Sequence, residues 1–60
     1  MRHAPFAAGD LVLVRLAAHR IRFIAAVISI DYDSQEALIE IQATGKRYTC
    51  PIDRLMTYNP

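Results

Sequence analysis

Apolar residues along the chain fall into short runs that are separated by turn-forming residues. The clearest alternation lies in residues 37–42, where Ala37, Ile39 and Ile41 share one face, as in a half-buried strand. The other runs are rich in valine and isoleucine, which favour strands. The pattern therefore predicts five short strands, at residues 11–16, 21–30, 37–42, 46–50 and 55–58.

Turn chemistry supports the boundaries of these strands. A glycine-acid pair precedes the first strand, "DYDSQE" follows the second and "ATGK" follows the third. Pro51 cannot donate a backbone hydrogen bond, so we expect the fourth strand to end there and residues 51–54 to form one turn of 3₁₀ helix. A helix across residues 17–30 is the competing interpretation, because periodicity alone cannot assign a short apolar run.

Chain length limits how the protein can be stabilised. The chain has 60 residues, and a domain of this size has a small core and marginal stability. Its single cysteine, Cys50, excludes an intrachain disulfide. We expect residues 1–5 to be a flexible N-terminal tail and residues 6–60 to be one domain. Self-association into a homo-oligomer is the expected source of further stability.

The residue pattern resembles that of SH3-like and Tudor-like barrels over residues 6–58. The segment "FAAGDLVLV" is similar to the opening of such barrels, where a glycine-acid turn leads into a strand with Val12 and Val14 inward. The segment "AAVISID" is similar to their second strand, and "PIDRL" stands where their 3₁₀ turn and last strand begin. The resemblance implies an all-β, five-stranded SH3-like barrel with a 3₁₀ turn before the last strand.

A narrower resemblance is to the plasmid-borne type B dihydrofolate reductases, which are tetrameric SH3-like barrels. Their sequences begin with a similar Phe-x-x-Gly-Asp pattern and end with Pro-Val-x-x-Leu. The matching residues here are Phe6, Gly9, Asp10, Pro51, Ile52 and Leu55. The Val-Gln-Ile-Tyr stretch that lines the pore in that family is replaced here by Arg47, Tyr48, Thr49 and Cys50. The resemblance implies a shared scaffold and, as an alternative function, a diverged relative with an oligomeric pore.

Large apolar side chains also fall on the strand faces that point away from the core. Because side chains alternate across a strand, inward Val12 and Val14 imply outward leucines beside them. The strand at residues 21–30 has apolar residues on both faces, and two-sided strands usually have both faces covered. Cover by the chain's own loops is the alternative to self-association. The predicted oligomer interface consists of Leu11, Leu13, Phe23 and Leu38.

The net charge is only +1, so any electrostatic function depends on how the charges are distributed. Basic residues flank the first and third connections, which lie at the same end of a meander, whereas Asp31, Asp33 and Glu36 occupy the second. We therefore expect a basic pole and an acidic pole. The leading prediction is a non-catalytic module that recognises nucleic acid or an acidic protein segment, with a ring near the cations to stack on a base. The predicted ligand-binding residues are Arg20, Arg22, Lys46, Arg47 and Tyr48.

Catalysis has little support in the sequence. Cys50 is the only cysteine, and it lies in a predicted strand without a helix N-terminus to lower its pKa. Metal-ligand spacing and phosphate-binding loops are absent from the sequence. We expect no catalytic residue, no metal and no cofactor. The longest apolar stretch is shorter than a membrane span, so we expect no membrane partner, and the lone thiol and the lack of a secretory signal favour the cytoplasm.

Overall fold

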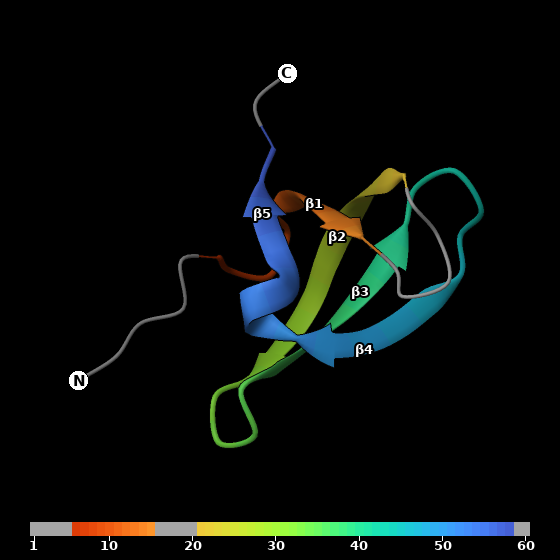
Figure 1. The fold of residues 1–60 in the computed structure, drawn as a ribbon. Helices are drawn as coiled ribbons and strands as arrows, with labels where there is room; N and C mark the ends of the chain where they lie inside the picture. The colour runs from red at the N-terminus through yellow and green to blue at the C-terminus, as the bar shows by residue number, and fades with distance from the viewer. Residues whose placement is uncertain (1–5, 16–20, 59–60) are drawn as a thin grey trace.

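The chain folds into five antiparallel strands in the computed structural model, which describes residues 6–15 and 21–58. These ranges contain no α-helix. The all-β prediction, with five strands and a 3₁₀ turn before the last of them, is confirmed (Figure 1). The elements are β1 (Leu11–Arg15), β2 (Arg22–Asp31), β3 (Glu36–Ile41), β4 (Arg47–Pro51), the 3₁₀ turn η1 (Ile52–Arg54) and β5 (Leu55–Thr57).

The strands form one curled sheet in the order β4-β3-β2-β1-β5. The central strand β2 has 10 residues. It pairs with β1 through residues 22–26 and with β3 through residues 25–31, with a bulge between Val27 and Ser29. A bulge bends a strand and increases its twist, which helps β2 to curl the sheet around the core. Within the described residues no ladder joins β4 to β5, so hydrogen bonds do not close the sheet.

Buried apolar side chains alternate along the strands and fill the inside of the curled sheet. Val12 and Val14 on β1 and Ile39 on β3 have no exposed surface. Burying a side chain of this size contributes about 1.5–3 kcal/mol. The inward faces predicted for these two strands are therefore confirmed. The other core residues are Phe6, Ala25, Val27, Ala37, Ile41, Cys50, Ile52 and Leu55.

The predicted turns are held by local hydrogen bonds. Gly9 has a φ angle of +95°, a backbone conformation that favours glycine. Its N–H donates to the Val27 carbonyl at 2.8 Å. The Asp10 carboxylate accepts the Ala7 N–H at 2.9 Å. In the turn between β2 and β3, the Asp31 carboxylate accepts the Asp33 N–H at 3.0 Å. The Asp side chains expected to favour these turns therefore bond the nearby backbone.

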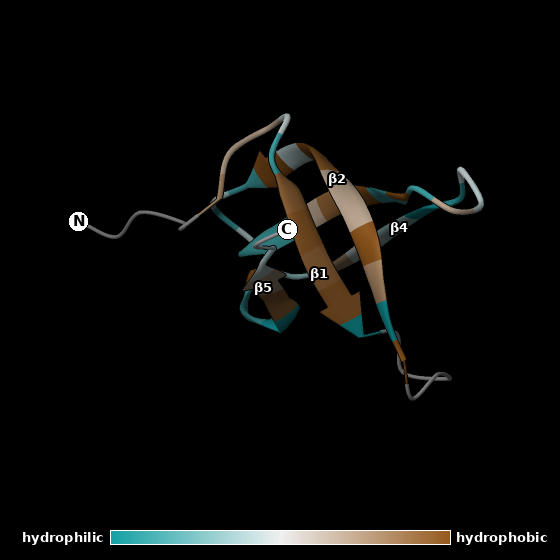
Figure 2. Ribbon diagram, turned by 90° about the horizontal axis from the view of Figure 1, so that it is seen from above, coloured by the Kyte–Doolittle hydropathy of each residue, from teal (hydrophilic) through white to brown (hydrophobic). Residues whose placement is uncertain are grey.

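An apolar surface covers the outer side of β1, β2 and β5. Leu13 is the cross-strand partner of both Ile24 and Met56, so these three form one row, and Leu11 with Ala26 forms the next. Leu11 is 46% exposed and Ile24 is 37% exposed. Figure 2 shows β1 as apolar along its length up to its polar last residue. We call these five residues the outer patch.

Phe23 and Leu38, which were predicted for the oligomer interface, lie outside the outer patch. Phe23 is the partner of the buried Val14, so it sits on the inner side and packs, partly buried, against the core. Leu38 does point outward and is half-buried. It lies on β3, where the charged Glu40 is the residue opposite Ala26 of the outer patch, and Leu38 itself is opposite Ser29. The outer patch therefore excludes both, and it includes Ile24, which the sequence interpretation left out.

The competing helix across residues 17–30 is wrong for residues 22–30, which form β2 and pair on both sides. Residues 1–5, 16–20 and 59–60 lie outside the described residues. The predictions made for the tail and for Arg20 therefore stay predictions.

Candidate anion-binding site

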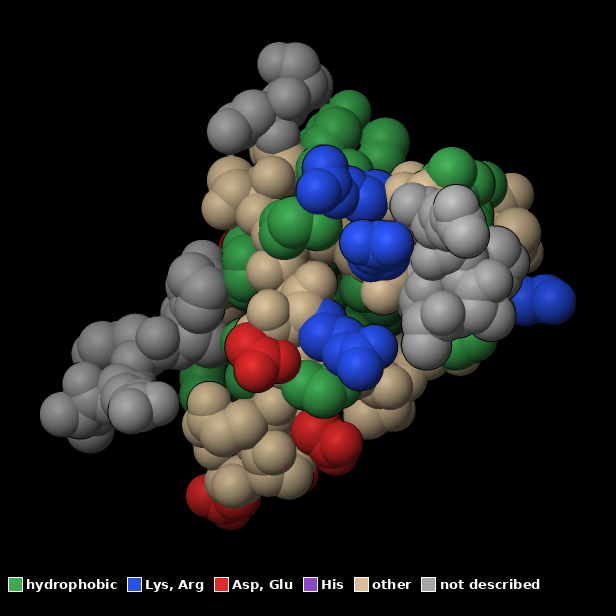
Figure 3. All heavy atoms as spheres, in the orientation of Figure 1, with side chains coloured by type: hydrophobic (Ala, Val, Ile, Leu, Met, Phe, Trp, Pro, Cys, Tyr) green, Lys and Arg blue, Asp and Glu red, His purple; other side chains and the backbone are tan. Residues whose placement is uncertain are grey.

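The two ends of the central strand β2 carry side chains of opposite charge. The central strand β2 begins at Arg22 and ends at Asp31, and Glu36 is the cross-strand partner of Asp31. Figure 3 shows acidic side chains toward the lower left of the view, whereas basic ones extend from its centre to the top and the right. We call the end of the sheet around Arg22 the basic end.

Two arginines lie directly opposite each other at the basic end. Arg15, the last residue of β1, is the cross-strand partner of Arg22, and both are exposed. Since Val12 and Val14 point inward, Arg15 shares the outer face with Leu13. Neither arginine has an ion-pair partner among the described residues. Like charges directly opposite each other destabilise a strand pair, so an anion bound here would relieve their repulsion.

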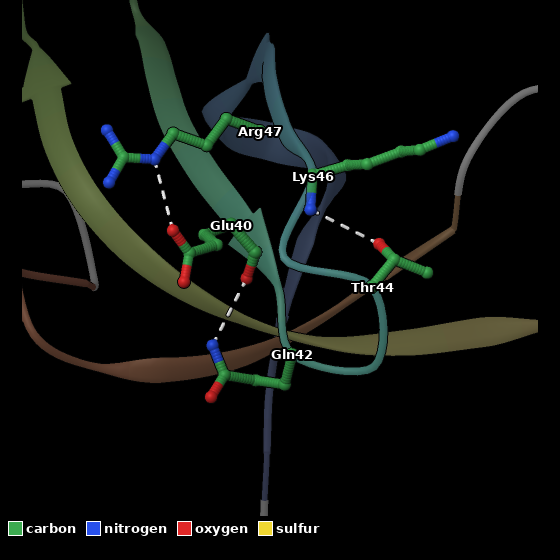
Figure 4. A network of polar contacts seen from close by, with 5 residues as sticks. All are labelled: Glu40, Gln42, Thr44, Lys46 and Arg47. Carbon is green, nitrogen blue, oxygen red and sulfur yellow. Dashed lines mark hydrogen bonds and ion pairs between the residues drawn. The ribbon is translucent and has the colours of Figure 1, made fainter.

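Lys46 is fixed at the same end by the turn between β3 and β4. The Gln42 N–H donates to the Ile24 carbonyl at 3.0 Å, which places the turn beside the start of β2. The Lys46 N–H donates to the Thr44 hydroxyl at 3.2 Å (Figure 4). The turn thus brings Lys46 to the end of the sheet where Arg22 lies.

Arg47 is engaged in an ion pair. Its Nε donates to Oε1 of Glu40, its cross-strand partner, at 3.0 Å. Figure 4 shows the Arg47 side chain directed at Glu40, whereas the Lys46 side chain extends the other way. An exposed pair of this kind contributes only about 0–1 kcal/mol to stability. Its larger effect is to offset the positive charge of Arg47.

Tyr48 and Arg47 point to opposite sides of the sheet. Tyr48 is the partner of the buried Ile39 and therefore lies on the inner side, whereas Arg47 lies on the outer side with Glu40. Tyr48 is nevertheless 37% exposed. Lys46 lies directly before β4, and its carbonyl accepts the N–H of the buried Ile41 at 2.8 Å, which continues the pairing with β3 and puts Lys46 on the same side as Tyr48. The predicted residues are thus divided between two faces, with Arg22 and Arg47 on the outer face and Lys46 and Tyr48 on the inner side.

Sequence reasoning missed Arg15. The sequence did contain a signal for Arg15. Arg22 was already a candidate, and a hairpin between the first two strands can make residues 15 and 22 cross-strand partners. Register depends on the turn geometry between the two strands, and that geometry lies in residues 16–20, outside the described residues.

Cys50 is a buried core residue. Burial raises the pKa of its thiol, an effect that Arg54 opposes and that Asp53 and Glu36 reinforce. A raised thiol pKa leaves little thiolate at neutral pH, and the thiolate is the reactive form. The side chain is therefore built for packing and not for nucleophilic attack.

The raised pKa predicts a stability that falls at alkaline pH. Because the folded-state pKa lies above the unfolded value, the contribution is complete below the unfolded pKa and is lost as pH rises through the folded one. Above about pH 9, the ordinary pKa of this thiol, the free energy of unfolding should fall in the natural chain more than in Cys50→Ala. Urea titrations at pH 7 and pH 10 would measure the difference. Parallel losses in the two proteins would contradict the assignment.

The described residues offer little other chemistry. Among residues 6–15 and 21–58, no three His, Cys, Asp or Glu side chains are grouped to hold a metal ion. In the same ranges, no helix has the length and apolar character needed to cross a bilayer.

No model of a known protein family matches the chain, and no curated protein matches it either.

Proposed function

We propose that the chain is a non-catalytic binding module on an SH3-like scaffold, which binds the clustered anions of a larger partner through its basic end. The observation that carries the proposal is the cross-strand pairing of Arg15 with Arg22. Such a pair costs stability in the free protein, and a bound anion offsets this cost. Phosphates of nucleic acid and carboxylates of an acidic protein segment both supply the required charge.

The SH3-like scaffold is supported by the strand order and by the 3₁₀ turn before β5. The residues shared with type B dihydrofolate reductases have structural roles in this chain. Phe6, Ile52 and Leu55 are core residues, Gly9 occupies a positive φ and Pro51 precedes η1. The shared pattern therefore supports a common scaffold and carries no chemistry of its own. A diverged reductase with an oligomeric pore is the alternative proposal, and it would require NADPH oxidation that depends on dihydrofolate.

Self-association through the outer patch is the second part of the proposal. Strands that are apolar on both faces usually have both faces covered. A chain of this length also gains stability from a partner. The patch lies next to Arg15 and Arg22 on the same outer face. Association would therefore bring the arginine pairs of different copies onto one assembly and raise its affinity for an extended polyanion.

Salt-dependent binding tests the anion site. Fluorescence anisotropy with a labelled oligonucleotide and with labelled polyglutamate would measure affinity from low to high salt. For a nucleic acid, Arg22→Ala should weaken binding and reduce the slope of log affinity against log salt by about 0.7–0.9 for each phosphate that the variant no longer neutralises. Arg22→Lys, which keeps the charge, should retain most of the slope.

The same variants separate a binding role from a structural one. Since Arg22→Ala removes a like-charge repulsion, its free energy of unfolding should stay equal or rise by about 0.2–1 kcal/mol. Binding that is independent of salt, or an affinity that Arg15→Ala and Arg22→Ala leave unchanged, would exclude the site.

A further inference from the structure

We infer that the polyanion bound at the basic end is single-stranded nucleic acid, with Tyr48 as the surface on which a base stacks. This inference rests on the proposed anion binding and names its ligand. It is carried by the position of Tyr48 beside Lys46 on the inner side of the edge strand β4.

Tyr48 combines a fixed backbone with an accessible side of the residue. Tyr48 is paired with Ile39 on β3, so its backbone is fixed within the sheet. No strand within the described residues pairs with the other edge of β4, and 37% of the residue is exposed. A tyrosine has only two side-chain torsions to order, so it offers contact area at low entropic cost. These are the properties of a stacking platform for an unpaired base.

Lys46 places a cation next to this ring. Lys46 lies directly before β4 and two residues from Tyr48, so at most about 7 Å of chain separates them, a separation of the same order as that between the phosphate and the base of one nucleotide. Lys46 has no ion-pair partner among the described residues, and its side chain extends away from the Arg47–Glu40 pair in Figure 4. Lys46 and Tyr48 can therefore contact the phosphate and the base of the same nucleotide.

Among the described residues, the turn that connects Lys46 to the start of β2 near Arg22 carries no carboxylate. From Lys46 back to Gln42 the turn contains only alanine, threonine and glycine between them, and Gln42 bonds the backbone of Ile24 beside Arg22. The nearby carboxylate of Glu40 is paired with Arg47. A flexible strand can thus follow cations from Arg22 to Lys46 and present a base at Tyr48, whereas an acidic peptide has no base for the ring.

The test compares two exposed tyrosines. Tyr48→Leu should weaken binding of a labelled oligo-dT by about 5- to 150-fold, the loss of one stacked base, and leave the salt slope unchanged. Tyr48→Phe should bind nearly as well as the natural chain. Tyr32→Leu is the matched control, because Tyr32 is 55% exposed and lies in the turn at the acidic end. It should leave affinity unchanged.

A spectroscopic measurement covers the case in which Tyr48→Leu fails to fold. The chain has three tyrosines and no tryptophan, so Tyr32→Phe combined with Tyr58→Phe leaves Tyr48 as the only strong emitter. Oligo-dT should quench its emission, and polyglutamate should not.

The outcomes distinguish the two levels of the proposal. Equal affinity for polyglutamate and oligo-dT, or salt-dependent binding that Tyr48→Leu does not weaken, overturns the nucleic-acid inference and leaves the anion site intact. The absence of salt-dependent binding to both polymers overturns the anion site itself.

Discussion

Ile39→Ala is expected to unfold a large fraction of the chain at room temperature. Ile39 is fully buried at the centre of β3, opposite Val27 on one side and Tyr48 on the other. Truncating such a residue typically costs about 2–5 kcal/mol, because it removes buried apolar surface and leaves a cavity. A single small core rarely supplies more than about 3–5 kcal/mol in total. Urea denaturation followed by circular dichroism would measure the change.

The control for this experiment is the neighbouring residue on the same strand. Leu38 is half-buried on the outer side, so Leu38→Ala removes a similar side chain without opening the core. Its cost should be clearly smaller than that of Ile39→Ala. Equal costs would mean that the inner and outer faces of β3 are not distinguished as described.

The double variant Leu13→Glu with Ile24→Glu is expected to abolish self-association. These two residues are direct partners at the centre of the outer patch. A few central residues carry most of the binding energy of an interface, about 2 kcal/mol or more for the strongest, and burying unpaired carboxylates adds a further cost. The natural chain should sediment as an oligomer at high concentration and dissociate on dilution, and the double variant should remain monomeric throughout.

Leu38→Glu introduces the same chemical change outside the outer patch and should leave the oligomer intact. If the natural chain is monomeric at every concentration, the outer patch is not a self-association surface. If Leu38→Glu disrupts the oligomer as strongly as the double variant, the interface lies elsewhere on the outer face.

Most of the fold could be predicted from local signals. Turn residues mark the ends of the strands, and the period of two identifies Val12, Val14 and Ile39 as inward. The same period also puts Phe23 on the side of the buried residues at 25 and 27, so its place in the core was within reach of the sequence.

The candidate site was harder to predict because it depends on which residues become cross-strand partners. Adjacent residues on a strand point to opposite faces, so Arg47 and Tyr48 could not share one surface. The Arg47–Glu40 ion pair and the Arg15–Arg22 pairing follow from register. Register in turn depends on hairpin geometry and on bulges such as the one in β2, which apolar periodicity does not reveal.

The open seam between β4 and β5 bears on the kind of assembly that the chain can form. An unpaired strand edge is a template for pairing with a strand of another chain. Repeated pairing of this kind builds an open-ended aggregate. Here β5 has only three residues, and β4 begins at Arg47 and ends at Pro51, which lacks a donor. Backbone pairing with another chain at either edge is therefore disfavoured. The short and blunted edges of this sheet therefore disfavour fibre growth by strand addition.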